Sequence, residues 1–340
     1  MNPIAIYSGS IVIYWSAVII MLGVAAGFFM SLSLRATQGG ESAALWIFLP
    51  MAVLLSVFFS RVIHWYCHLE QYSGFIGAMT DYSVGSFCLP GMLLGIFLAA
   101  VIVGRIGLTD SVAGLLDTLA PGTALTVAFI RLSALFNSSC RSKIIVTKPA
   151  LQHLPLAAPL SSASGVTEYR FATFYVQFLI MLVVCVLLLR FFYRRRELPM
   201  RDGGTGEGDT ARIFLLLYSA VEIVLDSTRY DSSFFHFTFL KGLNPYAGFI
   251  SLIQLIAAIS ILCVLIHYSK RSVRAGSLRA YHWVIWAVFV LCLAGIGVSE
   301  YMVQRHGDWY MGCYAVMSAS ALAMAFAVYR MYLSCCEERG

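Results

Sequence analysis

Ionisable side chains stand inside strongly apolar stretches of the chain, where they could bind a phosphate group or one another. Arg131 lies within ALTVAFIRLSALFNSS, and Arg61 lies within VFFSRVIHWY. A charge this deep in an apolar helix is costly unless it faces a partner or a polar cavity. The guanidinium group offers a planar fork of donors that matches phosphate oxygens. Both arginines are therefore candidate phosphate-binding residues.

A second group of ionisable residues is spaced for one face of a helix. Glu222 and Asp226 are four residues apart, and Arg229 follows three residues later. In a helix, these intervals place side chains on neighbouring turns of the same face. Together with Arg61 and Arg131, they predict a polar cavity inside a helical bundle. The alternative is a purely structural network of ion pairs.

The elements that must position these residues are membrane helices. Of the 340 residues, 60% are hydrophobic and only 12% are charged, and the mean hydropathy is +0.81. Such a chain lacks the polar surface that a water-soluble protein of this size needs to cover its core. We therefore predict an all-α, polytopic membrane helical bundle.

Apolar stretches close to the length needed to cross a bilayer, about 20 residues, recur along the whole sequence. We identify nine, at residues 11–34, 43–64, 87–103, 112–136, 171–192, 213–225, 247–266, 281–298 and 310–329. The sixth is short and has Glu222 and Asp226 near its end, so its hydropathy is the weakest. No basic region precedes the first stretch, so we expect it to remain in the mature protein rather than act as a signal peptide.

The cysteines do not indicate a metal site or a disulfide framework. The nine cysteines are scattered, mostly inside apolar stretches, with no Cys-x-x-Cys pair and no metal-ligand spacing with histidine. We expect them to pack as small buried hydrophobes. No metal and no cofactor are predicted, and nothing in the sequence indicates nucleic acid as a partner.

The positions of the lysines and arginines predict the orientation of the bundle. With the N-terminus outside and the C-terminus in the cytoplasm, most of the 23 basic residues fall on the cytoplasmic side, as the positive-inside rule requires. These are Arg35, Arg105, Arg190, Arg194, Arg195, Arg196, Arg201, Arg212, Lys270, Arg271, Arg274, Arg279, Arg330 and Arg339. The glycine-rich segment 201–210 reads as a flexible cytoplasmic loop.

One basic cluster opposes this rule. The end of the fourth span and the following loop place Arg131, Arg141, Lys143, Lys148 and Arg170 on the outer side. A basic cluster beside the bilayer suits the phosphate of a lipid headgroup. For the lysines, simple snorkelling at helix ends is an equal alternative.

Four segments, in order, resemble the prolipoprotein diacylglyceryl transferase family. The first is IYWSAVIIMLGVAAG, similar to the family's opening helix, and the second is FFSRVIHWYCHLE, whose Arg61 matches the arginine of the family's GGRLGY-like helix end. The third runs from SFCLPGMLLG through LLDTLAPGTALTVAFIRLSALFN and is similar to the family's SFHGGLIG and GRxGNFxN. The fourth is IFLLLYSAVEIVLDSTRYDSS, which is similar to the family's YGIGRFFIEGLRTDS. The resemblance covers about residues 1–267, a seven-span domain. Residues 268–340 form two additional spans.

The resemblance implies a bacterial plasma-membrane enzyme. This family transfers a diacylglyceryl group from phosphatidylglycerol to the cysteine of a lipoprotein precursor. Carried over residue by residue, it implies catalytic roles for Arg131 and Asp226. It implies that Arg61, Arg131, Asn137 and Arg229 bind the lipid phosphate. The expected partners are an anionic phospholipid and a lipoprotein precursor.

Several family positions are altered. Cys88 stands where the family has a histidine, and a buried thiol cannot replace imidazole as a proton shuttle near neutral pH. Glu222 stands where the family has an arginine, so the charge beside the lipid phosphate is reversed. Ser16 replaces a tyrosine, Ala134 an asparagine and Ser139 an acidic residue. Arg170 or Lys143 could offset the charge of Glu222 by folding over the cavity.

Two hypotheses follow. The first is a divergent transferase that keeps part of the phosphate clamp and lacks the family's histidine base. The second is a non-catalytic relative that binds anionic lipid or a membrane partner. The other histidines near the outer side, His64, His68, His153 and His236, read as interfacial residues. A small-solute transporter is less favoured, because neither inverted repeats nor paired broken helices are evident.

Overall fold

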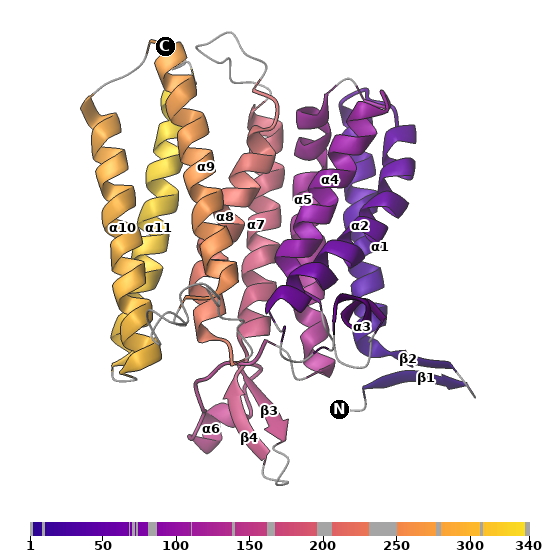
Figure 1. Cartoon of the computed structure of the whole chain (residues 1–340), viewed down its shortest axis with the longest axis vertical. Helices are drawn as coiled ribbons and strands as arrows, with labels where there is room; N and C mark the ends of the chain where they lie inside the picture. Colours follow the sequence, from indigo (N-terminus) through magenta and orange to yellow (C-terminus); the bar gives the residue numbers. More distant parts are fainter. Residues whose placement is uncertain are drawn as a thin grey trace.

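A computed structural model describes the chain at residues 3–8, 11–67, 69, 72, 74–80, 87–109, 111–137, 140–161, 167–195, 206–230, 250–276, 280–306 and 309–336. Within these residues the fold is all-helical apart from two short hairpins (Figure 1). Nine helices have 17 residues or more. The predicted all-α polytopic bundle is therefore confirmed. Of the polar loop expected at residues 201–210, residues 201–205 lie outside the described part, and Asp209 and Thr210 are the first residues of a long helix rather than loop.

The long helices coincide with the nine predicted apolar stretches. They are α1 (Trp15–Thr37), α2 (Ala43–Cys67), α4 (Leu89–Arg105), α5 (Val112–Ser133), α7 (Thr173–Arg195), α8 (Asp209–Thr228), α9 (Leu252–Arg274), α10 (Ala280–Arg305) and α11 (Tyr310–Ser334). Short elements connect them: α3 (Phe75–Thr80), α6 (Pro149–Gln152) and a single 3-10 turn, η2 (Ala134–Phe136).

Seven of these helices are long and apolar enough to cross a membrane. Two of the nine predicted spans, α4 and α8, are not among the seven. Helix α4 has only 17 residues, and α8 carries four charged side chains, Asp209, Arg212, Glu222 and Asp226. Since a buried helix needs no lipid-compatible surface, charges on α8 are tolerated where neighbouring helices pair with them.

Glycines allow two pairs of helices to pack at short range. On α1 and α5, Gly27 and Gly122 face each other, and a Cβ added to either would lie 2.5 Å or less from the other's carbonyl oxygen. On α4, a Cβ at Gly91 or Gly95 would collide with the backbone of α2. Small residues at membrane-helix interfaces permit this close backbone approach.

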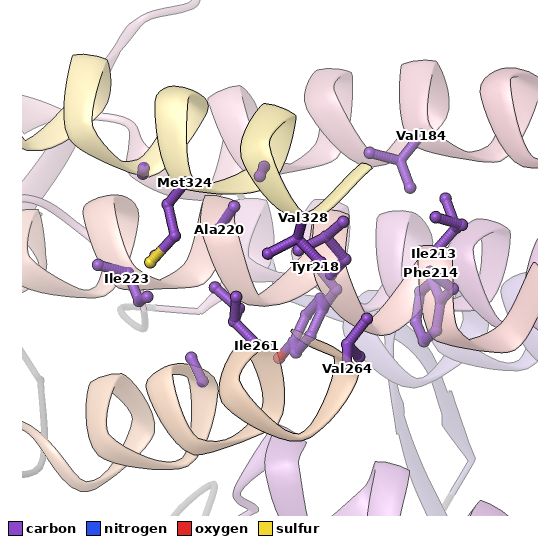
Figure 2. Close-up of a cluster of buried hydrophobic side chains, with 14 of the residues drawn as sticks. Val184, Ile213, Phe214, Tyr218, Ala220, Ile223, Ile261, Val264, Met324 and Val328 are labelled. Carbon is purple, nitrogen blue, oxygen red and sulfur yellow. The ribbon is translucent and has the colours of Figure 1, made fainter. Parts of the chain in front are cut away.

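Helix α8 lies in the packed centre of the bundle. Figure 2 shows its Ile213, Phe214, Tyr218, Ala220 and Ile223 among side chains of three other helices. The neighbouring side chains are Val184 from α7, Ile261 and Val264 from α9, and Met324 and Val328 from α11. The last helix therefore shares one hydrophobic core with the family-like part. Division into segments 1–267 and 268–340 remains a prediction.

Polar and extended segments gather at one end of the bundle, the end opposite the C-terminus in Figure 1. The hairpin of β1 (Ile4–Ser8) and β2 (Ile11–Tyr14) lies there, as does the hairpin of β3 (Ala157–Ser161) and β4 (Thr167–Phe171). Both hairpins are antiparallel. We call this the hairpin end. The basic residues between α5 and α7 lie at this end, because β3, β4 and α6 belong to the same connection.

Candidate functional site

The site is built around Arg131, in the last turn of α5 at the hairpin end. The Arg131 side chain is 6% exposed and forms an ion pair with Oε1 of Glu222 on α8. Its Nη1 also donates to Sγ of Cys140, at 3.1 Å. Arg131 thus joins α5, α8 and the segment that leads out of α5. The cavity predicted around this arginine is occupied in part by a protein carboxylate.

Glu222 is held from two sides. One oxygen accepts from Arg131, and the other accepts from Nε2 of Gln177 on α7, at 3.2 Å. Glu222 itself is only 2% exposed. The sequence indicated Arg170 or Lys143 as the residue that could offset this negative charge. In the structure the pairing cation is Arg131, because the last turn of α5 packs against α8 at this level.

Asp226 and Arg229 continue the network at the end of α8. Asp226 is fully buried and accepts from Nη1 of Arg229 at 3.2 Å. Asp226 also accepts from the hydroxyl of Ser251, the residue just before α9. The Ser251 hydroxyl in turn accepts from the backbone N–H of Gln254. Ser251 therefore both caps α9 and holds the Asp226 carboxylate in place. Glu222 and Asp226 are one helical turn apart. The Arg131–Glu222 pair and the Arg229–Asp226 pair each contain one positive and one negative charge, so their net charge is zero.

The segment that follows Cys140 is tied to the end of α8 by backbone hydrogen bonds. Lys143 N–H donates to the carbonyl of Thr228 at 2.8 Å, and Tyr230 N–H donates to the carbonyl of Arg141 at 2.7 Å. The Ser142 hydroxyl also donates to the Thr228 carbonyl, at 2.9 Å. These bonds hold a basic segment against the acidic end of α8. Burial lowers the pKa of both Arg141 and Lys143 from the ordinary values.

Arg170 and Arg61 lie at the same end of the bundle. Arg170 pairs with Glu168 at 2.9 Å, and its guanidinium lies 4.6 Å from the ring centre of Tyr230. Arg61, on α2, is 2% exposed, donates to the carbonyl of Ala78 and lies 5.8 Å from the ring centre of Phe87. The structure thus places the Arg131–Glu222 pair and the Asp226–Arg229 pair one turn apart on α8. That Arg61 joins them on one ligand remains a prediction.

The altered family positions fall in different surroundings. Cys88 precedes α4 as its N-cap residue, and its backbone N–H donates to the Ser60 hydroxyl at 2.6 Å. Ala134 is buried in η2, Ser16 is half-buried at the start of α1, and Asn137 is exposed just beyond η2. Ser139 lies outside the described residues. Ser60 and Arg61 are adjacent on α2, and Ser60 is bonded to Cys88 at the start of α4. Arg61 therefore lies near the Cys88 position.

Three buried polar atoms around Arg131 lack a hydrogen-bond partner among the residues that the structure describes. They are Nε of Arg131, Oε1 of Gln177 and the hydroxyl of Tyr218. Tyr218 lies one turn before Glu222 on α8, so both side chains point from the same face. Leaving such groups unsatisfied costs about 1 to 3 kcal/mol each. The arrangement is therefore suited to binding a polar group or water beside the ion pair.

Sequence reasoning missed two of these residues. Gln177 stands in the apolar stretch FYVQFLI, and a lone amide inside a membrane helix is a signal that could have indicated it. Cys140 directly precedes the basic segment, but a sulfur atom carries no sequence signal for an arginine partner. Among the described residues, no group of three or more His, Cys, Asp and Glu side chains is placed to hold a metal ion.

A second buried network, not predicted from the sequence, lies at the opposite end of α8. Asp117 of α5 pairs with Arg195 of α7 and accepts from the backbone N–H groups of Gly208 and Ala211, at 2.7 and 3.0 Å. Asp209 pairs with Arg212 at 2.8 Å and with Arg271 at 3.3 Å, and accepts from the Tyr268 hydroxyl at 3.2 Å. Each carboxylate here has protein partners, which indicates a structural role.

Comparison with known proteins completes the description of the site. A search of curated proteins finds no match. The family model described as prolipoprotein diacylglyceryl transferase matches residues 3–268, which span α1 to α8 and most of α9 and include Arg61, Arg131, Glu222, Asp226 and Arg229. The chain therefore belongs to the prolipoprotein diacylglyceryl transferase family.

Proposed function

We propose that this protein is a divergent diacylglyceryl transferase. It would take the diacylglyceryl group from phosphatidylglycerol or a similar anionic phospholipid and attach it to the cysteine thiol of a lipoprotein precursor. The new bond joins the cysteine sulfur to a glycerol carbon of the diacylglyceryl group. The bond that breaks joins that carbon to a phosphate oxygen, and the phosphate leaves with the headgroup glycerol. The thiol proton passes to a base.

One observation carries the proposal. The arginine that matches the family's GRxGNFxN signature, Arg131, is buried at a helix end, near polar atoms that have no hydrogen-bond partner among the described residues. Buried cations with donors directed at a phosphate stabilise the charge that develops on a leaving group. Asp226 would orient Arg229 for the same phosphate, since the two side chains are already paired. Family membership supports the reaction class.

The protein would act in the bacterial plasma membrane, with its N-terminus outside and its C-terminus in the cytoplasm. The arginine distribution supports this orientation. It places the hairpin end, and with it Arg131, at the outer leaflet, where a lipoprotein precursor is reached after export. Arg61 and Asn137 would contribute further contacts to the lipid.

A specific observation favours the second hypothesis, a non-catalytic relative that binds lipid or a membrane partner. Arg131 already has an anion, Glu222, where the family places an arginine. The lipid phosphate must therefore compete with the Glu222 carboxylate for Arg131. Cys88 also stands in place of the family's histidine, and losing a general base typically slows a reaction about 10²- to 10⁴-fold.

Complementation distinguishes these possibilities. In bacteria depleted of their own transferase, we expect slow but measurable lipoprotein modification that disappears in Arg131→Gln. Arg105→Gln, an exposed arginine at the other end of the bundle, is the matched control and should retain it. Membrane levels of each variant are measured by immunoblot, so that failed insertion is recognised. Absence of modification in the wild type at normal membrane levels would favour the non-catalytic relative.

A further inference from the structure

The two helices outside the family match reach the site. Lys143 lies in the segment between α5 and α7, and its Nζ donates to Oε1 of Gln304 on α10, at 2.8 Å. Nε2 of Gln304 donates to Oε1 of Glu300, one turn earlier on the same helix, at 2.7 Å. Both residues lie beyond position 268, where the family match ends. A chain of hydrogen bonds therefore runs from the added helix to a cation of the family-like part.

Lys143 is placed beside the end of α8 by its backbone. Its N–H is bonded to the carbonyl of Thr228, two residues after Asp226. Helix α11 contacts the same end, because the hydroxyl of Tyr314 donates to the carbonyl of Ser227 at 3.3 Å. Thus α10 holds the Lys143 side chain while α11 holds the backbone next to Asp226.

The positive charge that Lys143 presents depends on whether the side chain bonded to it is neutral or negatively charged. Gln304 is neutral, so its hydrogen bond with the Lys143 ammonium does not itself neutralise the positive charge. A carboxylate at position 304 would instead form an ion pair and reduce the net charge presented to a ligand. Glu300 is 2% exposed and accepts a hydrogen bond from Nε2 of Gln304. This bond orients the amide so that its oxygen faces Lys143.

We propose that the α10–α11 pair is part of the lipid-binding site and holds Lys143 as a further cation for the phosphate of the anionic lipid, beside Asp226 and Arg229. Gln304 and Glu300 act as positioning residues. This inference rests on the proposed function. It gives the added helices a role, because they fix the position of a cation, Lys143, near the site whose positive charge Glu222 reduces.

The test measures the preference of the purified protein for phosphatidylglycerol over phosphatidylcholine in nanodiscs that contain both lipids, together with thermal stability in phosphatidylcholine alone. Lys143→Gln should reduce the preference about fivefold, the loss expected for one lysine near an anionic lipid surface. Lys143→Arg should retain it. Lys270→Gln, an exposed lysine near the end of α9 that lies opposite the hairpin end, is the matched control and should change nothing.

Gln304→Glu separates binding from structure. If Gln304 only stabilises the fold, a carboxylate that pairs with Lys143 should leave the lipid preference unchanged. Our proposal expects the preference to fall as in Lys143→Gln. Stability should fall modestly as well, because the new carboxylate loses the hydrogen bond to Glu300 and stands one turn from that acid. Unchanged preference in Lys143→Gln and Gln304→Glu would overturn the inference. If Arg131→Gln still lowered the preference in that case, the proposed function would survive; if Arg131→Gln also had no effect, both would fail.

Discussion

At the scale of single residues, the ion pair between Arg131 and Glu222 determines what the site can bind. Both side chains are buried, and Gln177 holds the second oxygen of the carboxylate. A buried pair of this kind is costly to break, because removing one partner leaves an unpaired charge in a poorly solvated site. The same pair reduces the attraction of Arg131 for a phosphate. Stability without lipid and affinity for lipid therefore oppose each other at this position.

Glu222→Gln tests this opposition. Without lipid phosphate, the variant should unfold at a lower temperature, because Arg131 loses its anion. Phosphatidylglycerol should then raise its unfolding temperature more than it does for the wild type, since a ligand that binds more tightly stabilises the folded state more. An affinity gain of about tenfold is expected, equal to about 1.4 kcal/mol and well below the roughly 4 kcal/mol of a unit charge pair at 4 Å near a protein surface.

The matched control is Asp209→Asn, which removes a buried anion at the opposite end of α8. It should lower stability without enhancing the response to phosphatidylglycerol. Equal lipid responses in Glu222→Gln and Asp209→Asn would show that Glu222 does not restrain lipid binding.

At the scale of elements, α8 is fixed at both ends by buried charges and in the middle by apolar packing. Asp117 holds the start of the helix through two backbone N–H groups and Arg195. Glu222 and Asp226 hold its end through α5, α7 and α9. This explains why a helix with four charged residues belongs in the bundle: each of them is paired with a neighbour or a helix terminus. Carboxylates near a helix N-terminus also interact favourably with its dipole.

Asp117→Asn should therefore destabilise the whole bundle. The change removes the charge that pairs with Arg195 and replaces one acceptor oxygen with a donor. We expect a loss of about 3 kcal/mol, the size typical of breaking a buried ion pair. Unfolding in detergent followed by circular dichroism measures it. Glu41→Gln, an exposed acid before α2, serves as the control and should leave the transition in place. A transition in Asp117→Asn that matches this control would refute the structural role.

The helices were largely predictable from the sequence, and their contacts were not. Apolar length gives the position of each membrane helix almost directly, so even the weak stretch at 213–225 proved to be a helix, α8. The spacing of Glu222, Asp226 and Arg229 gave their common face. The spacing could not predict which helix packs against that face, because packing depends on side chains far apart in the chain. The Arg131 partner, Gln177 and the network at Asp117 therefore emerged only in three dimensions.

At the scale of the whole molecule, nine long helices in the described residues alternate in direction, so the two termini lie at opposite ends of the bundle (Figure 1). The hairpin end carries the candidate site, and the other end carries the network of Asp117 and Asp209. The positive-inside rule would place the hairpin end outside the cytoplasm. The concentration of basic residues between α5 and α7 is then an exception linked to the site.

Labelling tests this orientation. In cells that express the chain with its own cysteines replaced, Lys148→Cys should react with a membrane-impermeant maleimide from outside. Arg274→Cys, exposed at the opposite end of α9, should react only after the membrane is permeabilised. The reverse pattern would invert the topology and place the candidate site in the cytoplasm.

The most direct measurement is transfer itself. Purified protein in nanodiscs is given phosphatidylglycerol labelled in its acyl chains and a lipoprotein-precursor peptide with one cysteine. We predict slow covalent labelling of that cysteine, absent in Arg131→Gln and faster in the double variant Cys88→His with Glu222→Gln, which restores a base and frees the arginine. A peptide that remains unlabelled by both the wild type and the double variant, in protein that still binds phosphatidylglycerol, would contradict the proposed transferase.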